Sequence, residues 1–516
     1  MTSRRPIRIC VPVCETKGEA LKHAARAAAI LGDLVELRLD CLDAIEFETV
    51  INEIDELSTA LSCSVILTFR STEQGGHRAL DYASRSAFWN SRQGERGGAF
   101  FDIELDLATE LMSPRGAPVA PAWSRIICSH HDFSGVPADL ERIYELMVNT
   151  PARVLKIAVH ACDITDCLPV FRLLERARSE GREMIAIAMG SAGIATRVLG
   201  PSLGAFLTYG SLQDESATAP GQITASDLMS LYRIDEITEQ TSICGLVGRP
   251  VMHSVSPNMH NAAFEFANID GVYLPFDVGD VISFFKRMVH PRTREIDWNL
   301  RGLSITAPHK LSVMDCLDWI EPTAKEIGAV NTVVVEADRL LGYNTDAAGL
   351  IEPLLKRLGS LGELQVAVIG AGGAASAAVW GLQKHEAKVT LFVRDLKKGK
   401  YLVERFNVSC KELSSASFGE YDVVINATPL GSVGDTMREA PVSAKQLAKA
   451  GLVYDLVYNP IETQLLRNAC EAGCATLGGV EMLVAQAGRQ FKLWTGESAT
   501  PSVMHAAATG ALRVRS

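Results

Sequence analysis

The chain has 516 residues, of which 47% are hydrophobic and 22% charged, and its formal net charge is −11. This length predicts two or three domains, and the composition is typical of a globular protein with an ample core. The basic residues form no long run, which argues against a nucleic-acid surface, and no window approaches eighteen consecutive apolar residues, so we expect no membrane span.

The N-terminal segment and the cysteines indicate the compartment. Met1-Thr-Ser-Arg-Arg5 is followed by no signal-like apolar region and contains no Ser/Arg-rich transit segment, which predicts a cytoplasmic protein. None of the twelve cysteines has the spacing of a zinc site, so we expect no metal and reduced cysteines that fill the core. The closest pairs in sequence are Cys10/Cys14, Cys162/Cys167 and Cys470/Cys474.

The first half alternates short β-branched runs with helical stretches such as Gly18–Leu31, 140–149 and 168–180. Eight such repeats over residues 1–236 predict an α/β domain of the (β/α)8 TIM-barrel class. The expected strands are 7–13, 34–39, 64–69, 100–105, 125–129, 154–159, 184–189 and 206–209.

Charged residues alternate with apolar ones in several of these strands. Glu36, Arg38 and Asp40 share one strand face, and Asp102, Glu104 and Asp106 repeat the pattern. We expect this face to point into the barrel, either as a site or as an interior salt-bridge network. Active sites of this fold lie at the C-terminal strand ends, where Arg70 and the pair His130-His131 are expected.

Lys156 lies in an otherwise apolar strand. A lysine amine in an apolar pocket beside other cations loses its proton more readily and can attack a ketone. Alone, a strand lysine is a weak signal, but its convergence with histidine and arginines indicates Schiff-base chemistry.

Five ordered motifs resemble type I 3-dehydroquinate dehydratase. They are Glu-Leu-Arg-Leu-Asp at 36–40, Thr-Phe-Arg at 68–70, His-Asp-Phe at 131–133, Lys-Ile-Ala at 156–158 and Ala-Pro-Gly-Gln at 219–222. The resemblance implies that Lys156 forms the imine and that His131 transfers protons. It also implies a set of substrate-binding residues: Glu36, Arg38 and Arg70 for ring hydroxyls, Arg197 for the carboxylate, and Thr218 and Gln222 as a closing segment.

One position departs from this family. A glutamate that orients the catalytic histidine is usual before the paired glycines, and this chain has Gln74 there. An amide can hydrogen-bond an imidazole but cannot stabilise an imidazolium as a carboxylate does. We therefore hypothesise reduced, not absent, dehydratase activity.

The second half follows a polar link at about 235–242. We expect a substrate lobe at 243–345, joined by C-terminal helices at about 481–516, and a Rossmann dinucleotide lobe at 363–480. The strand Gln365–Ile369 is followed by a glycine-rich turn and a helix starting at Ala374, a pattern that favours pyrophosphate binding. The turn residues are Gly370, Ala371, Gly372, Gly373 and Ala374.

The strand Lys388–Val393 ends in Arg394, and Lys397 follows three residues later. An NAD site usually has an acidic residue at this strand end, whereas arginine suits the 2′-phosphate of NADP. The acidic residue Asp395 argues against this interpretation, but Arg394 and Lys397 together favour NADP over NAD.

Ordered motifs across 243–510 resemble shikimate dehydrogenase. They include Ser254-Val-Ser256, Ser304-Ile-Thr306-Ala-Pro-His-Lys310, Asn331-Thr, Asn344-Thr-Asp346, Asn426-Ala-Thr428, Tyr458-Asn-Pro and Gln486-Ala. The resemblance implies that Lys310 and Asp346 flank the reacting carbonyl. It further implies that Ser254 and Ser256 bind the carboxylate, that Thr306, Asn331, Tyr458 and Gln486 bind hydroxyls, and that Thr428, Leu456 and Gly479 contact the cofactor. Taken singly, Lys310 could be a solvated turn lysine and Asp346 a helix N-cap.

Together the halves predict a bifunctional enzyme of the shikimate pathway with small-molecule substrates, NADPH, no nucleic acid and no membrane; the sequence predicts no oligomeric state. One alternative is a quinate dehydrogenase that uses NAD and has weak barrel activity. Others are a catalytically inactive regulatory homologue and a class I aldolase-like barrel.

Overall fold

The computed structural model describes residues 7–91, 98–112 and 122–515. The residues Met1–Arg5, on which the targeting prediction depends, lie outside these ranges. The chain divides into two compact units. The first comprises 1–241 with 274–280 and 295–298, and the second comprises the remaining segments from Ser242 onward.

The first unit is built on an eight-stranded parallel sheet in the order β7-β6-β5-β4-β3-β2-β1-β8. A bridge between Met184 and Ala205, just before β8, brings the two edges together. The TIM-barrel prediction is therefore confirmed. The strands are β1 (Ile9–Val13), β2 (Leu34–Arg38), β3 (Ser64–Thr68), β4 (Phe100–Glu104), β5 (Ile126–Asp132), β6 (Val154–His160), β7 (Glu183–Met189) and β8 (Thr208–Tyr209).

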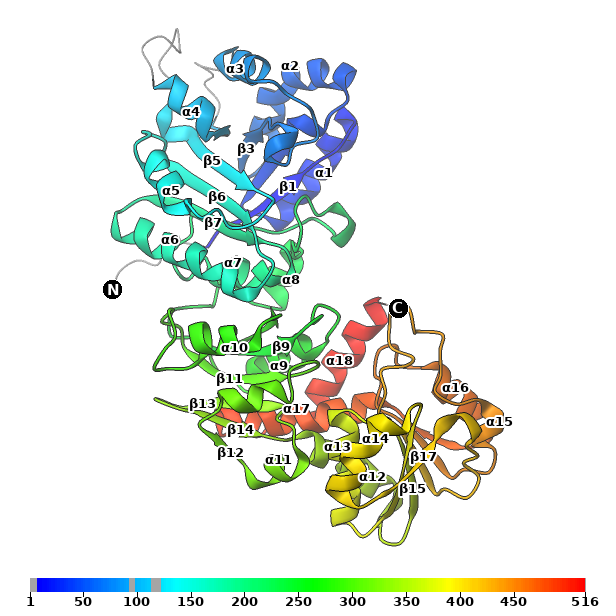
Figure 1. The fold of residues 1–516 in the computed structure, drawn as a ribbon. Helices are drawn as coiled ribbons and strands as arrows, with labels where there is room; N and C mark the ends of the chain where they lie inside the picture. The colour runs from blue at the N-terminus through cyan, green and yellow to red at the C-terminus, as the bar shows by residue number, and fades with distance from the viewer. Residues whose placement is uncertain (1–6, 92–97, 113–121, 516) are drawn as a thin grey trace. The chain divides into compact units, whose positions relative to one another are not determined.

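Helices follow the strands and cover the outside of the barrel, as Figure 1 shows in blue to green. They are α1 (Gly18–Leu31), α2 (Ala44–Ala60), α3 (Tyr82–Ser91), α4 (Leu105–Leu111), α5 (Leu140–Val148), α6 (Cys167–Ser179), α7 (Ile194–Leu199) and α8 (Ala225–Ser230).

Two local expectations are corrected. The fourth strand ends at Glu104, so Asp106 lies in α4 and pairs with Arg85 at 2.8 Å instead of facing the barrel interior. The fifth strand extends to Asp132, so His130 and His131 are strand residues rather than loop residues. For both strands the alternation of residue types in the sequence did not show at which residue the strand ends.

The barrel interior is layered. An apolar cluster with members from all eight strands includes Cys10, Leu34, Ile66, Ile127 and Val154. Further along the strands the inward-facing residues are charged and almost fully buried. Because strand side chains alternate between faces, Leu34, Glu36 and Arg38 of β2 share the inward face, with the apolar residue in one layer and the charged residues in the next.

The expectation that all cysteines are reduced is wrong for Cys14 and Cys41, which form a disulfide. Cys14 follows β1 and Cys41 closes a short turn after β2, and these strands pair in parallel. Their C-terminal ends therefore lie together, and the two Cα atoms are 5.4 Å apart, within the range that a disulfide spans. The bridged cysteines are 27 residues apart, so the short spacing of pairs such as Cys10/Cys14 did not identify the pair that forms the disulfide.

The remaining strands form two sheets, which belong to the second unit except for residues 274–277 of β10. The first is mixed, in the order β10-β9-β11-β13-β14-β12. Its strands are β9 (Ser242–Gly248), β10 (Gly271–Asp277), β11 (Leu300–Ile305), β12 (Trp319–Ile320), β13 (Thr332–Val335) and β14 (Leu340–Tyr343). The helices of this lobe are α9 (Ser256–Phe266), α10 (Val281–Phe284), α11 (Pro322–Ile327), α17 (Gly479–Thr495) and α18 (Pro501–Arg515). The last two helices pack with β9 and α9 in one apolar cluster that includes Cys244, Met259, Phe491 and Met504.

The second sheet is parallel, in the order β17-β16-β15-β18-β19-β20, which is the Rossmann strand order. Its strands are β15 (Gln365–Ile369), β16 (Lys388–Val393), β17 (Ser409–Glu412), β18 (Val423–Asn426), β19 (Leu452–Asp455) and β20 (Ala475–Leu477). One apolar cluster joins one face to α12 (Asp346–Leu358), α13 (Gly373–Lys384) and α14 (Leu396–Phe406). A second cluster joins the other face to α15 (Ala444–Leu447) and α16 (Gln464–Glu471).

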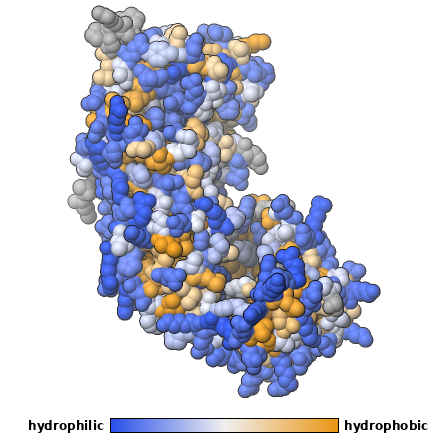
Figure 2. Space-filling model, viewed as in Figure 1, coloured by the Kyte–Doolittle hydropathy of each residue, from blue (hydrophilic) through white to orange (hydrophobic). Residues whose placement is uncertain are grey.

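Among the described residues no helix is both long enough and apolar enough to cross a membrane. On the face drawn in Figure 2, hydrophilic residues cover most of the surface, and the hydrophobic ones form small groups.

Candidate active sites

A cavity with an empty volume of about 460 Å³ opens among the C-terminal strand ends of the barrel. Its lining includes all eight residues that the sequence assigned to the barrel site, although they come from six different strands or their following loops. These residues are Glu36, Arg38, Arg70, His131, Lys156, Arg197, Thr218 and Gln222.

Lys156 projects from β6 and is 4% exposed. Its Nζ lies 2.7 Å from Asp102 Oδ2 and 3.4 Å from Glu36 Oε1, and 4.6 Å from the centre of the Tyr209 ring. The groups in direct contact with the amine are carboxylates, and the expected neighbouring cation is Arg70, whose Nη2 lies 2.7 Å from the same Asp102 oxygen. These ion pairs fix the position of Nζ at the base of the cavity.

Asp102 is the centre of this network, and sequence reasoning did not include it in the site. Its carboxylate also accepts from Arg70 Nη2 at 2.7 Å and from Ser129 Oγ at 2.6 Å. Burial opposes its charge, but Arg70 and Lys156 outweigh burial and hold the pKa of Asp102 well below its usual range. The alternation of charged and apolar residues in β4 was the sequence signal that could have placed Asp102 in the site.

His131 projects from β5 and is buried. Burial, together with Arg70 and Lys156, lowers the pKa of His131 well below its ordinary value, so the imidazole is held neutral and able to accept a proton. Its Nδ1 has no hydrogen-bond partner within the described part of the chain.

Gln74 does not orient the imidazole of His131. Its Oε1 accepts from the backbone N–H of His131 at 2.9 Å. The loop that carries it turns at Gly75, where φ is +80° and an added Cβ would lie 2.2 Å from Phe133 Cζ. Only glycine fits this turn, which brings Gln74 to the strand bearing His131.

The arginines of the cavity differ in their partners. Arg38 makes two hydrogen bonds to Asp40, at 3.0 and 2.8 Å. Arg197 is 1% exposed and lies against no carboxylate of the described chain; burial lowers its pKa to about 10. A buried guanidinium without an anionic partner is suited to bind a carboxylate. Arg197 Nη2 is 3.5 Å from the carbonyl oxygen of Pro220, in the segment where Gln222 Oε1 accepts from the Thr218 backbone N–H at 2.8 Å.

Tyr209, at the end of β8, also lines the cavity and was missed by sequence reasoning. Its hydroxyl is buried, with no partner among the described residues. Burial, with smaller contributions from Glu36, Cys10 and Asp102, raises the pKa of Tyr209 well above its ordinary value, so the phenol stays protonated and can donate a hydrogen bond.

In the second unit, Lys310 and Asp346 form an ion pair with 2.5 Å between Nζ and Oδ2. Lys310 follows β11, and Asp346 is the first residue of α12, whose N-cap position is held by Thr345. The alternative of Asp346 as the cap is therefore wrong. Its second oxygen accepts from Asn331 Nδ2 at 2.8 Å, so both oxygens are engaged and the lysine is held in one place.

The other predicted substrate residues of this unit lie on neighbouring elements. The Gln486 side chain, on α17, is 3.5 Å from Asn331 Nδ2. Ser254 and Ser256, at the start of α9, are joined by a 3.1 Å hydrogen bond between their hydroxyls. Thr306 directly follows β11, and Tyr458 packs against the apolar cluster of α9 and α17.

The glycine-rich turn has the geometry of a nucleotide site. Gly370 has φ +121°, and a Cβ there would meet Ala427 O at 2.9 Å and Thr428 Cγ2 at 3.1 Å. A side chain at Gly372 would meet no described atom within 4 Å, which leaves the approach to the N-terminus of α13 open. This helix begins at Gly373, one residue earlier than expected, and its first turn can face a phosphate.

Further cofactor candidates surround this turn. A Cβ on Gly373 would lie 3.5 Å from Lys310 Cδ, so the turn borders the ion pair with Asp346. Leu456 follows β19, and Gly479 lies close against its carbonyl oxygen. Together with Ala371 and Ala374 of the turn itself, these residues cluster at the C-terminal edge of the sheet.

At the end of β16, Arg394 and Lys397 are exposed. The Asp395 carboxylate, which opposed the NADP assignment, accepts from the Lys397 backbone N–H at 2.9 Å as the N-cap of α14. Its carboxylate is thus engaged in capping, and the basic groups are left to meet a phosphate.

Comparisons with known proteins identify the families that match the two halves of the chain. Residues 9–239 match the family model of type I 3-dehydroquinase. Residues 246–333 match the shikimate dehydrogenase substrate binding domain, 353–456 match shikimate / quinate 5-dehydrogenase, and 479–509 match the shikimate 5′-dehydrogenase C-terminal domain.

The relatives include fused and single proteins. The bifunctional 3-dehydroquinate dehydratase/shikimate dehydrogenase of Arabidopsis thaliana, a chloroplastic protein, is 33% identical over 96% of this chain and 83% of its own length. Shikimate biosynthesis protein AroDE of Chlamydia pneumoniae is 29% identical over 95% of this chain and 94% of its own. Shikimate dehydrogenase (NADP(+)) of Methanococcus maripaludis is 36% identical over 54% of this chain and 100% of its own. The chain belongs to the bifunctional 3-dehydroquinate dehydratase/shikimate dehydrogenase family.

Proposed function

We propose that the barrel dehydrates 3-dehydroquinate to 3-dehydroshikimate and that the second unit reduces this product to shikimate with NADPH. The observation that carries the proposal is the convergence in one cavity of Lys156, neutral His131 and Arg197, a guanidinium with no carboxylate partner in the part of the chain that the structure describes. The Lys310–Asp346 pair beside an open glycine-rich turn supports the second reaction.

In the barrel, Arg197 binds the substrate carboxylate and places the ketone at Lys156. The amine attacks the carbonyl carbon, water leaves, and a protonated imine forms that withdraws electrons from the neighbouring carbon. His131 removes a proton from that carbon and then protonates the departing hydroxyl. Hydrolysis of the imine returns the free lysine. Glu36, Arg38 and Arg70, with Thr218 and Gln222, hold the ring, and the Tyr209 hydroxyl donates to a substrate oxygen.

In the second unit, NADPH supplies the hydride when bound. Gly370 to Ala374, with Thr428, Leu456 and Gly479, hold the dinucleotide, and Arg394 and Lys397 meet its 2′-phosphate. Lys310 donates the proton to the carbonyl oxygen, and Asp346 keeps the ammonium in position for that transfer. Ser254 and Ser256 bind the substrate carboxylate, while Thr306, Asn331, Tyr458 and Gln486 bind its hydroxyls.

Borohydride trapping tests the barrel mechanism. Reduction in the presence of 3-dehydroquinate should attach the substrate skeleton to Lys156, located by peptide mass spectrometry. Lys156→Arg should give no adduct and no dehydratase activity while its dehydrogenase activity persists. An active wild-type enzyme whose adduct maps to another lysine, or that forms none, would contradict the mechanism.

The alternatives are tested separately. Steady-state rates with shikimate and quinate, each with NADP and NAD, distinguish a shikimate from a quinate dehydrogenase. An inactive homologue would show neither reaction. A cytoplasmic location and the absence of nucleic-acid and membrane partners stay predictions from the sequence.

A further inference from the structure

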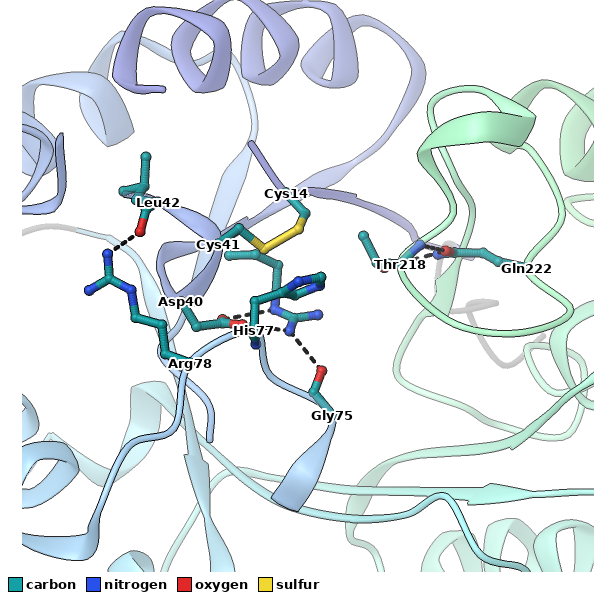
Figure 3. Close-up of a disulfide and its surroundings, with 10 residues drawn as sticks. Cys14, Asp40, Cys41, Leu42, Gly75, His77, Arg78, Thr218 and Gln222 are labelled. Carbon is teal, nitrogen blue, oxygen red and sulfur yellow. Dashed lines mark hydrogen bonds and ion pairs between the residues drawn. A yellow bond between two sulfur atoms is a disulfide. The ribbon is translucent and has the colours of Figure 1, made fainter. Parts of the chain in front are cut away.

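Three side chains that can bind a metal lie together at the C-terminal ends of β1, β2 and β3. Cys14 directly follows β1, Cys41 ends the turn after β2, and His77 lies in the loop after β3. One atom from each lies within 4.8 Å of the others, a grouping not repeated elsewhere in the described residues. Figure 3 shows the disulfide between the two cysteines with His77 beside it.

The donor set has a definite preference among metals. Two thiolates and one imidazole suit Zn²⁺ and similar thiophilic divalent cations, and a Cys2His set leaves a fourth tetrahedral position for water. The sulfur atoms act as such ligands only as thiolates, so the disulfide closes the site. Sequence spacing gave no sign of this set, because its members are 27 and 36 residues apart.

We propose that Cys14, Cys41 and His77 form a binding site for one thiophilic divalent cation, with Zn²⁺ as the type, that opens when the disulfide is reduced. A dithiol reductant supplies two electrons and two protons, which convert the disulfide into two thiols while the reductant becomes a disulfide. Binding of the cation then releases the two thiol protons and forms two metal–sulfur bonds.

The backbone that carries these side chains is anchored by bonds that do not involve sulfur. The backbone N–H of His77 donates to Asp40 Oδ2 at 3.0 Å, and the same carboxylate holds Arg38. Arg78 donates to the carbonyl of Leu42, next to Cys41. These contacts hold the β2 turn beside the β3 loop, and the backbone N–H of Asp43 donates to Thr16 O at 2.9 Å, which holds the segment after β1 against the β2 turn. Reduction therefore leaves the ligands near one another.

The cluster is also accessible. His77 is exposed and Cys14 is partly exposed, while Cys41 is 8% exposed. A small reductant and a cation can therefore reach one edge of the group, and the buried cysteine lies on the inner side. This placement is independent of the dehydratase assignment, so the proposal can fail while the proposed function stands.

The experiment uses the full chain. The protein is reduced with a phosphine, freed of phosphine and metal under anaerobic conditions, and titrated with Zn²⁺ against a chromophoric chelator; Co²⁺ gives the ligand signature by thiolate charge-transfer absorption. The variants are Cys14→Ser/Cys41→Ser and His77→Ala. Cys470→Ser and His385→Ala, which alter an exposed unbridged cysteine and an exposed histidine, are the matched controls.

We expect the reduced wild type and both controls to bind one Zn²⁺ that the double cysteine variant does not bind. Loss of His77 should weaken binding at least about tenfold, since even outer-shell partners of a metal are worth that much. The oxidised protein should bind no ion at this site and gain two alkylatable thiols on reduction.

Equal Zn²⁺ binding by the reduced wild type and the double variant would overturn the proposal. If reduced His77→Ala bound Zn²⁺ as tightly as the reduced wild type, the imidazole would not be a ligand, and the three-ligand site would be overturned. Binding to the oxidised protein as tight as to the reduced one would refute the gating. Retention of both enzyme activities shows that the double variant is folded. If the double variant does not fold, the Zn²⁺ affinity of His77→Ala, which keeps both cysteines, tests the proposal in its place.

Discussion

The hydroxyl of Tyr209 gives a prediction in which stability and catalysis change in opposite directions. It is buried without a partner among the described residues, in a cavity that holds Lys156. A buried hydroxyl left unpaired costs about 1–3 kcal/mol. Tyr209→Phe keeps the ring over the lysine and removes this cost, so the free barrel should become more stable by up to that amount.

The same change should slow the dehydratase. If the hydroxyl donates to the bound substrate, its loss removes a neutral hydrogen bond worth about 0.5–1.5 kcal/mol, which corresponds to a roughly 2- to 13-fold lower kcat/KM. Steady-state kinetics with 3-dehydroquinate measure the second effect. Heat inactivation of the dehydratase measures the first, and the dehydrogenase activity of the same sample is the internal reference.

Tyr144→Phe is the matched control. The Tyr144 hydroxyl donates to Glu180 Oε2 at 2.7 Å, and its ring is fully buried outside the cavity. This variant should lose stability and keep its dehydratase kinetics. A Tyr209→Phe enzyme that also loses stability and keeps its kcat/KM would refute the reasoning, because its hydroxyl would then bond within the barrel.

Four other predictions concern the two sites. Because the pKa of His131 is depressed, its neutral form persists as the pH falls through the ordinary histidine value of about 6.5, so dehydratase kcat/KM should stay level there and decline only at lower pH. Gln74→Glu adds a carboxylate beside His131, which should raise that pKa and move the decline to higher pH; an unchanged rate and profile would count against our hypothesis that Gln74 reduces activity. Lys310→Ala should abolish most dehydrogenase turnover with far less effect on NADPH binding by fluorescence, and undiminished turnover would exclude the lysine from proton transfer. Arg394→Ala should raise KM for NADPH more than for NADH; an equal change for both would exclude contact with the 2′-phosphate.

The sequence predicted those features that depend on one strand at a time. The alternation at Glu36, Arg38 and Lys156 placed these charges in the barrel interior because a strand has a fixed side-chain period. The order of strands and helices predicted both the barrel and the Rossmann sheet, since parallel sheets require such crossovers.

Features that depend on contacts between neighbouring strands could not be predicted from the sequence of a single strand. The disulfide between Cys14 and Cys41 and the contacts of Asp102 with Lys156 and Arg70 result from the strand register. Tyr209 was missed because its strand has only two residues and its ring looks like ordinary core. The capping by Asp395 became visible only with the start of α14 in place.

The ion pairs around Lys156 have a consequence for the energetics of the covalent step. Three anionic side chains (Glu36, Asp40 and Asp102) and three cationic ones (Arg38, Arg70 and Lys156) balance one another, and Arg197 adds one positive charge that a bound carboxylate cancels. An ammonium and a protonated imine carry the same charge. The protein can therefore exchange one for the other without rearranging its fixed dipoles, so the interior is already polarised for the intermediate before any substrate arrives.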